Sequence, residues 1–129
     1  VQDGTIVAVA TDHAPHTDAE KSVAFEQAPR GIIGLETAAS LAWELLADDP
    51  QRFFDRMSRG PARIAGLASQ GGDIRVGEAA NLVVFDPALE WVAGRFESRS
   101  QNSPWLGKSL RGRVVATVYG GRVTHRIAN

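Results

Sequence analysis

The stretch TIVAVATDHAPH, residues 5–16, carries the strongest structural signal in the sequence. Its first half, residues 5–10, is short, apolar and rich in β-branched side chains. This pattern predicts a strand that is buried on both faces. A buried strand followed by a loop and a helix makes one βα unit, and barrel enzymes carry their active site at the carboxyl ends of such strands. The stretch therefore predicts an α/β fold with reactive groups placed at a strand end.

The region after this stretch is predicted to be a long loop followed by helices. Residues 11–31 form the loop, which at about 20 residues is longer than most connections in a compact domain. Residues 35–47 have one apolar stripe at helical spacing, and Asp48-Asp49-Pro50 is expected to end that helix. A second helix is expected over residues 51–57. A short third helix would have Pro61 in its first turn and Gly66 as its cap.

The remainder of the chain has the pattern of β-structure. We expect a strand at residues 81–87 and a weaker one at residues 90–93. Residues 113–119 and 122–126 are rich in β-formers and are separated by Gly120-Gly121, which predicts a hairpin with a two-residue turn. The change from helical to β pattern falls near residues 68–73.

Composition places the chain among ordinary globular proteins and excludes several classes. The 129 residues are 43% hydrophobic and 22% charged. The net charge is -1, so the chain lacks the excess of positive charge that would indicate nucleic acid as a partner. The absence of cysteine excludes disulfides and thiolate metal sites. No apolar run approaches the roughly 20 residues that span a bilayer. We therefore expect a cytoplasmic protein with a packed core that includes the aromatic residues Trp43, Phe53, Phe54, Phe85 and Tyr119.

The polar turn after the first predicted strand is the candidate for chemistry. Asp12 follows the end of the strand, where a carboxylate can serve as a metal ligand, a general base or both. His13 and His16 are close to it in sequence, and Pro15 stiffens the backbone between them. An aspartate at this place also commonly caps a turn through its own side chain. The residues alone leave both interpretations open.

A family resemblance favours the chemical interpretation. The run ATDHAPHTDAEK, residues 10–21, resembles the second signature of dihydroorotases: a small residue, Thr or Ser, Asp, any residue, Ala-Pro-His, four residues and Lys. Other segments resemble the same family at the expected offsets, namely residues 25–31, 34–37, 57–58 with 61–64, 81–86 and 102–105. The resemblance implies that residues 1–70 are the last βα units of a (β/α)8 metal-dependent hydrolase barrel. Residues 71–129 would then be the C-terminal strands of a small β-sandwich.

The resemblance also implies roles for residues at matching positions. Asp12 would be the catalytic aspartate, touching a zinc ion and carrying a proton. His16 would contact the substrate, and Arg30 and Gly31 would touch it through the backbone of their loop. His13 lies at the variable position of the signature, so the resemblance assigns it no role.

The implied reaction is the reversible hydrolysis of dihydroorotate to N-carbamoyl-L-aspartate, a step of pyrimidine synthesis. The implied cofactor is zinc, one or two ions, which would activate the attacking water. A catalytic zinc needs about three protein ligands and an open position. The only histidines here are His13, His16 and His125, so the family's remaining ligands are absent. We therefore expect this chain alone to be inactive, and to be poorly folded or self-associating.

Two alternatives remain beside this hypothesis. One is a non-catalytic, dihydroorotase-like partner of aspartate transcarbamoylase, against which the retained Asp12 and His16 argue. The other is a related cyclic amidohydrolase, an allantoinase or a hydantoinase. In each enzymatic case the partner is a small-molecule substrate, with neither nucleic acid nor membrane involved. Assembly as a homo-oligomer or with aspartate transcarbamoylase stays open.

Overall fold

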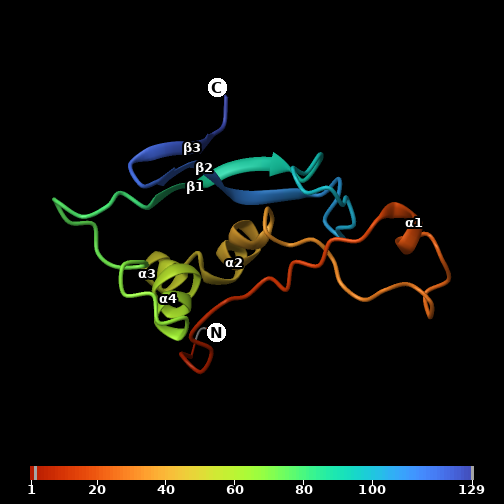
Figure 1. Ribbon diagram of the computed structural model, residues 1–129, viewed down its shortest axis with the longest axis horizontal. Coiled ribbons are helices and arrows are strands. Elements are labelled where there is room, and N and C mark those ends of the chain that lie inside the picture. Colours follow the sequence, from red (N-terminus) through yellow and green to blue (C-terminus); the bar gives the residue numbers. More distant parts are fainter. Residues whose placement is uncertain (2, 129) are drawn as a thin grey trace.

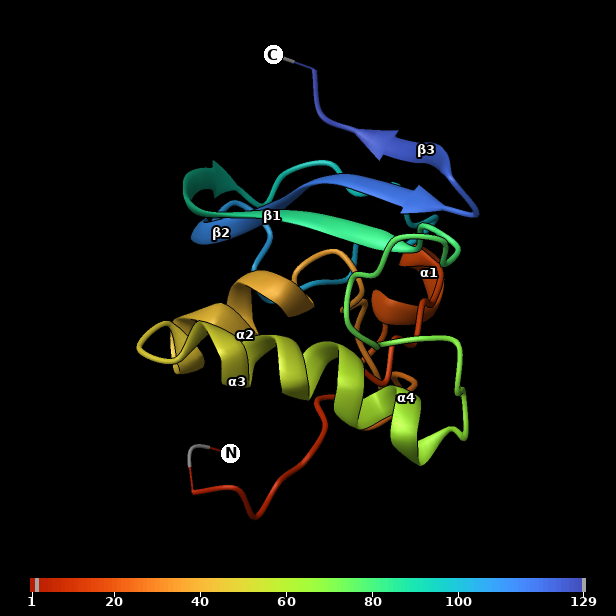
Figure 2. The ribbon, with the colours of Figure 1, turned by 90° about the vertical axis from the view of Figure 1, so that its left-hand side faces the viewer.

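The computed structural model describes residues 1 and 3–128, which form a layer of helices against a three-stranded sheet. Figure 1 shows the sheet above α2, with α3 and α4 beyond it and α1 apart at the end of a long excursion of the chain. Figure 2 shows the N-terminal segment passing on the far side of the helices from the sheet. Within the described residues, none of the helices has the length and apolar character that crossing a bilayer would require.

The predicted strand at residues 5–10 is wrong for this structure. The segment has no strand assignment, and its side chains at Ile6 and Val7 are each 48% exposed. A strand needs a neighbour to satisfy its backbone groups, and no strand of the described chain lies beside this segment. Its backbone instead contacts a helix, because the amide of Val9 donates to the carbonyl of Arg56 at 3.0 Å. The predicted burial on both faces is therefore wrong as well, since Thr5, Ile6, Val7 and Ala10 are exposed and Ala8 and Val9 are half-buried.

The predicted loop contains one short helix, α1, and is followed by α2. α1 (Asp18–Lys21) lies inside it and starts with a capping box between Thr17 and Glu20. α2 (Ala38–Leu46) begins later than predicted, since residues before it form a turn in which the amides of Thr37 and Ala38 donate to the carbonyl of Gly34.

The predicted second and third helices are one continuous run. α3 (Pro50–Phe54) passes into the π-helix η1 (Asp55–Arg59) and then α4 (Gly60–Ile64). Pro61 has no amide hydrogen, so a regular α-helix would lose a bond there, and the π-turn accommodates this by pairing the amide of Gly60 with the carbonyl of Asp55. Gly60 also lies against the N-terminal segment, where an added Cβ would be 1.9 Å from the carbonyl oxygen of Val7. Only glycine fits at that crossing.

The sheet has the order β1-β2-β3 and is entirely antiparallel. β2 (Ser109–Tyr119) and β3 (Arg122–Arg126) form the predicted hairpin, and Gly120 and Gly121 both have positive φ, 55° and 77°, as a two-residue turn of this kind requires. β1 (Leu82–Val92) joins the two strands that were predicted separately. The interruption around Pro87 survives as an irregularity in the register between Asp86 and Glu90.

An aromatic cluster fastens the helices to the sheet. The ring of Trp43 packs edge-on against Phe53 and Phe85, at centroid distances of 5.2 and 5.4 Å. Trp43 and Phe53 are buried as predicted and Phe85 partly so. The prediction is wrong for Phe54 and Tyr119, which are 44% and 69% exposed. The ring of Phe54 still contacts that of Phe53 at a centroid distance of 5.0 Å, and Tyr119 is the last residue of β2. A second cluster of buried residues contains Ile33, Ala93, Phe96 and Leu110. The division into residues 1–70 and 71–129 stays a prediction.

Gly112 packs closely against the aromatic cluster, so a substitution there tests how much this packing contributes to stability. An added Cβ would lie 2.5 Å from Phe85 and 2.9 Å from Trp43, and the φ of Gly112 is +81°. Gly107 has nearly the same φ, +78°, with nothing near its Cβ position. Gly112→Ala should therefore cost about 1–3 kcal/mol more unfolding free energy than Gly107→Ala, since overpacking adds to the shared backbone strain. Urea unfolding of both variants measures the difference, and equal losses would contradict the packing argument.

Candidate active-site loop

Asp12 has an unusual backbone. Its φ of +42° makes it the only non-glycine residue in the described chain with a positive φ. Aspartate tolerates the left-handed region better than most side chains, but such a conformation still costs of order 1–3 kcal/mol and persists only when the surroundings enforce it. Asp12 is exposed, and within the described residues its carboxylate makes no hydrogen bond or ion pair. A strained residue with a free carboxylate is typical of a functional site.

The backbone after Asp12 runs beside a second segment. His13 forms a parallel bridge with Ile32, and the amide of Ala14 donates to the carbonyl of Ile32 at 2.9 Å. The close approach depends on Gly31, whose φ is +112° and whose added Cβ would lie 2.5 Å from the Cβ of Ala14. The two ends of the long loop are thereby held together.

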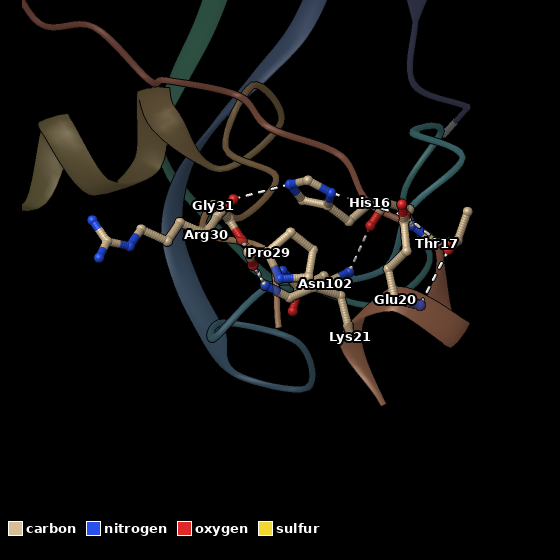
Figure 3. A network of polar contacts seen from close by, with 9 residues as sticks. His16, Thr17, Glu20, Lys21, Pro29, Arg30, Gly31 and Asn102 are labelled. Carbon is tan, nitrogen blue, oxygen red and sulfur yellow. Dashed lines mark hydrogen bonds and ion pairs between the residues drawn. The ribbon is translucent and has the colours of Figure 1, made fainter. Parts of the chain in front are cut away.

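The carbonyls of Pro29, Arg30 and Gly31 are each bound by a side chain from elsewhere (Figure 3). His16 donates from Nε2 to the carbonyl of Arg30 at 2.9 Å. Lys21 donates from Nζ to the carbonyls of Pro29 and Gly31, at 2.7 and 3.1 Å. These contacts fix the backbone of residues 29–31 from the side of α1.

A further contact reaches the same loop from the other end of the chain. Asn102 donates from Nδ2 to the carbonyl of Gly31 at 2.9 Å, and its own carbonyl accepts from the amide of Ile33 at 3.0 Å. Figure 3 shows the guanidinium of Arg30 extending away from this network. The side chain of Arg30 is therefore not what holds the loop.

Three of the four predicted site residues are brought together here, and two residues without a predicted role join them. His16, Arg30 and Gly31 share the network, whereas Asp12 lies outside its hydrogen bonds. Lys21 occupies a fixed position of the signature and Asn102 lies in a family-like segment, so both were visible in the sequence. Their role in holding the loop could not be predicted, because Lys21 and Asn102 bind backbone carbonyls, which every residue has.

Glu20 gives the loop a pH-dependent element. Its carboxylate accepts from the amide and hydroxyl of Thr17, both at 2.8 Å. These bonds, with the backbone bond the larger cause and a smaller contribution from the charge of His16, hold the pKa of Glu20 below its ordinary value of 4.5. A depressed acid pKa means that the capping box contributes fully above the unfolded pKa and is lost as the pH falls through the lower folded one.

The residues of this chain do not form a metal site by themselves. Among the residues described, no group of three His, Cys, Asp or Glu side chains is placed to hold an ion. His13 Nδ1 accepts from backbone amides and His16 Nε2 donates to a carbonyl, so neither nitrogen is free for a metal. Asp12 offers one carboxylate, where a catalytic zinc takes about three protein ligands.

Comparisons with known proteins give a consistent result. The sequence profile described as "Amidohydrolase family" matches residues 1–124. The chain is 43% identical over 128 residues to a dihydroorotase from Anaeromyxobacter dehalogenans, covering 95% of this chain and 29% of that protein. It is 45% identical to a dihydroorotase from Citrifermentans bemidjiense, covering 96% and 30%. A D-hydantoinase (dihydropyrimidinase) from Thermus sp. superposes with a TM-score of 0.83 at 28% identity, covering 96% and 29%. The chain thus spans about 30% of the length of the curated relatives it matches.

Lys21 provides a test of the network. Lys21→Met keeps the aliphatic stem but removes the charged donor, whose hydrogen bonds are worth about 1.5–3 kcal/mol in comparable cases. We expect faster amide hydrogen exchange over residues 22–31 in this variant, measured by mass spectrometry. Lys108→Met is the matched control, since Lys108 is exposed and its Nζ has no partner in the described structure. Similar exchange in both variants would show that Lys21 does not hold the loop.

Proposed function

Because the chain belongs to the amidohydrolase family, we propose that it forms part of a dihydroorotase, which interconverts dihydroorotate and N-carbamoyl-L-aspartate. The observation that supports this most is Asp12, a free and exposed carboxylate on a left-handed backbone inside a complete dihydroorotase signature. The similarity to dihydroorotases along nearly the whole chain supports the same substrate class.

The proposed task of Asp12 is proton transfer. In the hydrolytic direction a water oxygen adds to the ring amide carbon, the carbon–nitrogen bond breaks and the ring nitrogen gains a proton. Asp12 would accept the proton from the water and deliver it to that nitrogen. Within the described residues its exposed carboxylate has no partner, which leaves it open to contact water and substrate.

The proposed task of the loop at residues 29–31 is to bind the substrate through its backbone. The three carbonyls are occupied by His16, Lys21 and Asn102. The amides of Arg30 and Gly31 have no partner in the described part of the chain. Free N–H groups suit an anionic substrate, and dihydroorotate carries a carboxylate. We also propose that His16 contacts the substrate, as the resemblance implies; its Nε2 binds the carbonyl of Arg30, and its Nδ1 lies 3.9 Å from a carboxylate oxygen of Glu20.

Zinc is proposed on the family resemblance alone. Among the residues that the structure describes, the available ligands do not complete such a site. The proposed setting is cytoplasmic pyrimidine synthesis, with assembly as a homo-oligomer or with aspartate transcarbamoylase.

A hydantoinase or allantoinase is the second candidate, favoured by the hydantoinase among the solved structures that superpose on the chain. These enzymes also open a cyclic amide, so Asp12 would act in the same way. Rates of the whole protein on dihydroorotate, hydantoin and allantoin separate the candidates. Preference for dihydroorotate supports the proposal, and preference for either other ring overturns it.

Asp12→Asn tests the proton-transfer role in the whole protein. Asparagine keeps the shape of the side chain and tolerates the left-handed backbone, so the substitution removes the base and little else. We expect kcat to fall about 10²–10⁴-fold, the usual worth of general acid–base catalysis. Asp48→Asn, at an exposed aspartate at the end of α2, is the control and should leave kcat unchanged. Turnover by Asp12→Asn within tenfold of the parent protein, a loss short of this range, would rule out the assignment.

The isolated chain should neither hydrolyse dihydroorotate nor bind zinc stoichiometrically. The reason is the ligand count, and the exposed apolar side chains at Ile6, Val7, Val83 and Val84 give a reason to expect self-association as well. Size-exclusion chromatography, a zinc titration and an assay with added zinc are the measurements. A monodisperse monomer would contradict the expected self-association, and turnover above a zinc-only blank would contradict the ligand count.

A further inference from the structure

We propose that His13 is the residue that positions Asp12, by accepting hydrogen bonds from the backbone that leads into α2. This inference rests on the proposed function, since it assigns a role toward the proposed catalytic carboxylate. It concerns the one histidine of the turn to which the signature gives no role.

The contact itself is specific. Nδ1 of His13 accepts from the amide of Gly34 at 3.1 Å and from the amide of Leu35 at 3.3 Å. A neutral imidazole accepts at only one nitrogen, so acceptance at Nδ1 places the ring proton on Nε2. The ring is half-buried, and these two hydrogen bonds join it to the turn before α2.

Gly34 also contacts the residue on the other side of Asp12. An added Cβ at Gly34 would lie 3.3 Å from both the Cβ and the carbonyl oxygen of Thr11. The two neighbours of Asp12, Thr11 and His13, thus meet the same glycine. A residue in a sparsely populated conformation persists only where its surroundings over-determine it, and these two contacts supply that constraint.

The constraint leads to the rigid part of the molecule. The carbonyl of Gly34 accepts from the amides of Thr37 and Ala38, which begin α2. α2 is anchored in the aromatic core through Trp43 and Leu46. His13 therefore fixes the position of Asp12 relative to the packed helix α2. Positioning of this kind matters because displacement of a reacting group by about 1 Å can cost of order 10²-fold in rate.

The test compares two substitutions of His13 in the whole protein, in steady-state assays with dihydroorotate. His13→Leu fills the space but removes the acceptor, and His13→Asn keeps an acceptor oxygen close to the place of Nδ1. We expect kcat of His13→Leu to fall about 10–100-fold with KM changed by less than about threefold, as loss of positioning at the reacting group predicts. His13→Asn should recover most of that loss. Equal damage in both variants, or a kcat of His13→Leu close to the parent value, would overturn the inference.

A second measurement needs no variant and keeps the inference testable if His13→Leu fails to fold. The ¹⁵N NMR shifts of the His13 ring in the parent protein distinguish the two neutral tautomers. A proton on Nε2 with an unprotonated, hydrogen-bonded Nδ1 is expected, and a proton on Nδ1 would overturn the inference. If the parent protein does not hydrolyse dihydroorotate, the proposed function is wrong. The ¹⁵N shifts of the His13 ring do not depend on that result, so they test the inference on their own.

Discussion

Two glycines, Gly31 and Gly34, let the start and the end of the long loop touch, and the arrangement of the candidate site depends on that contact. Gly31 gives room to Ala14, and Gly34 gives room to Thr11. Backbone hydrogen bonding between Ala14 and Ile32 then fixes the direction of both segments. Asp12 sits in the middle of this contact with its carboxylate outside it. An added Cβ would collide with Ala14 at Gly31 and would crowd Thr11 at Gly34, and both residues lie on the segment that carries the carboxylate.

The contact between the two ends of the loop rests on a core in which the helices pack against the sheet. The hydroxyl of Ser40, on α2, donates to the carbonyl of Gly112, on β2, and in turn accepts from the indole of Trp91, on β1. These buried polar bonds specify one register of helix against sheet, because an unpaired buried group would be costly. The β region thus does more than follow the helical region in sequence. It also holds the helix from which the candidate site takes its position.

The parts of the fold that the sequence predicted well are those set by local chemistry. The turn at Gly120-Gly121, the helix over most of residues 35–47 and its end before Pro50 all depend on a few adjacent residues. Residues 5–10 were misassigned because a strand is completed by partners that local sequence does not supply. The same limit applies to the site: the signature singled out Asp12 and His16, but the roles of Lys21 and Asn102 arise from carbonyls, which have no sequence signal.

The π-helix between α3 and α4 has a consequence for how this protein tolerates changes in length. A π-turn contains one residue more than an α-turn, and removal of one residue from Asp55–Arg59 would restore a regular helix. Each residue of an α-helix turns the chain by about 100°, so everything after the deletion would rotate by that amount. Gly60 would leave its crossing with Val7, and the carbonyl of Arg56 would no longer face Val9. We therefore expect homologous chains to vary in sequence here far more readily than in residue count.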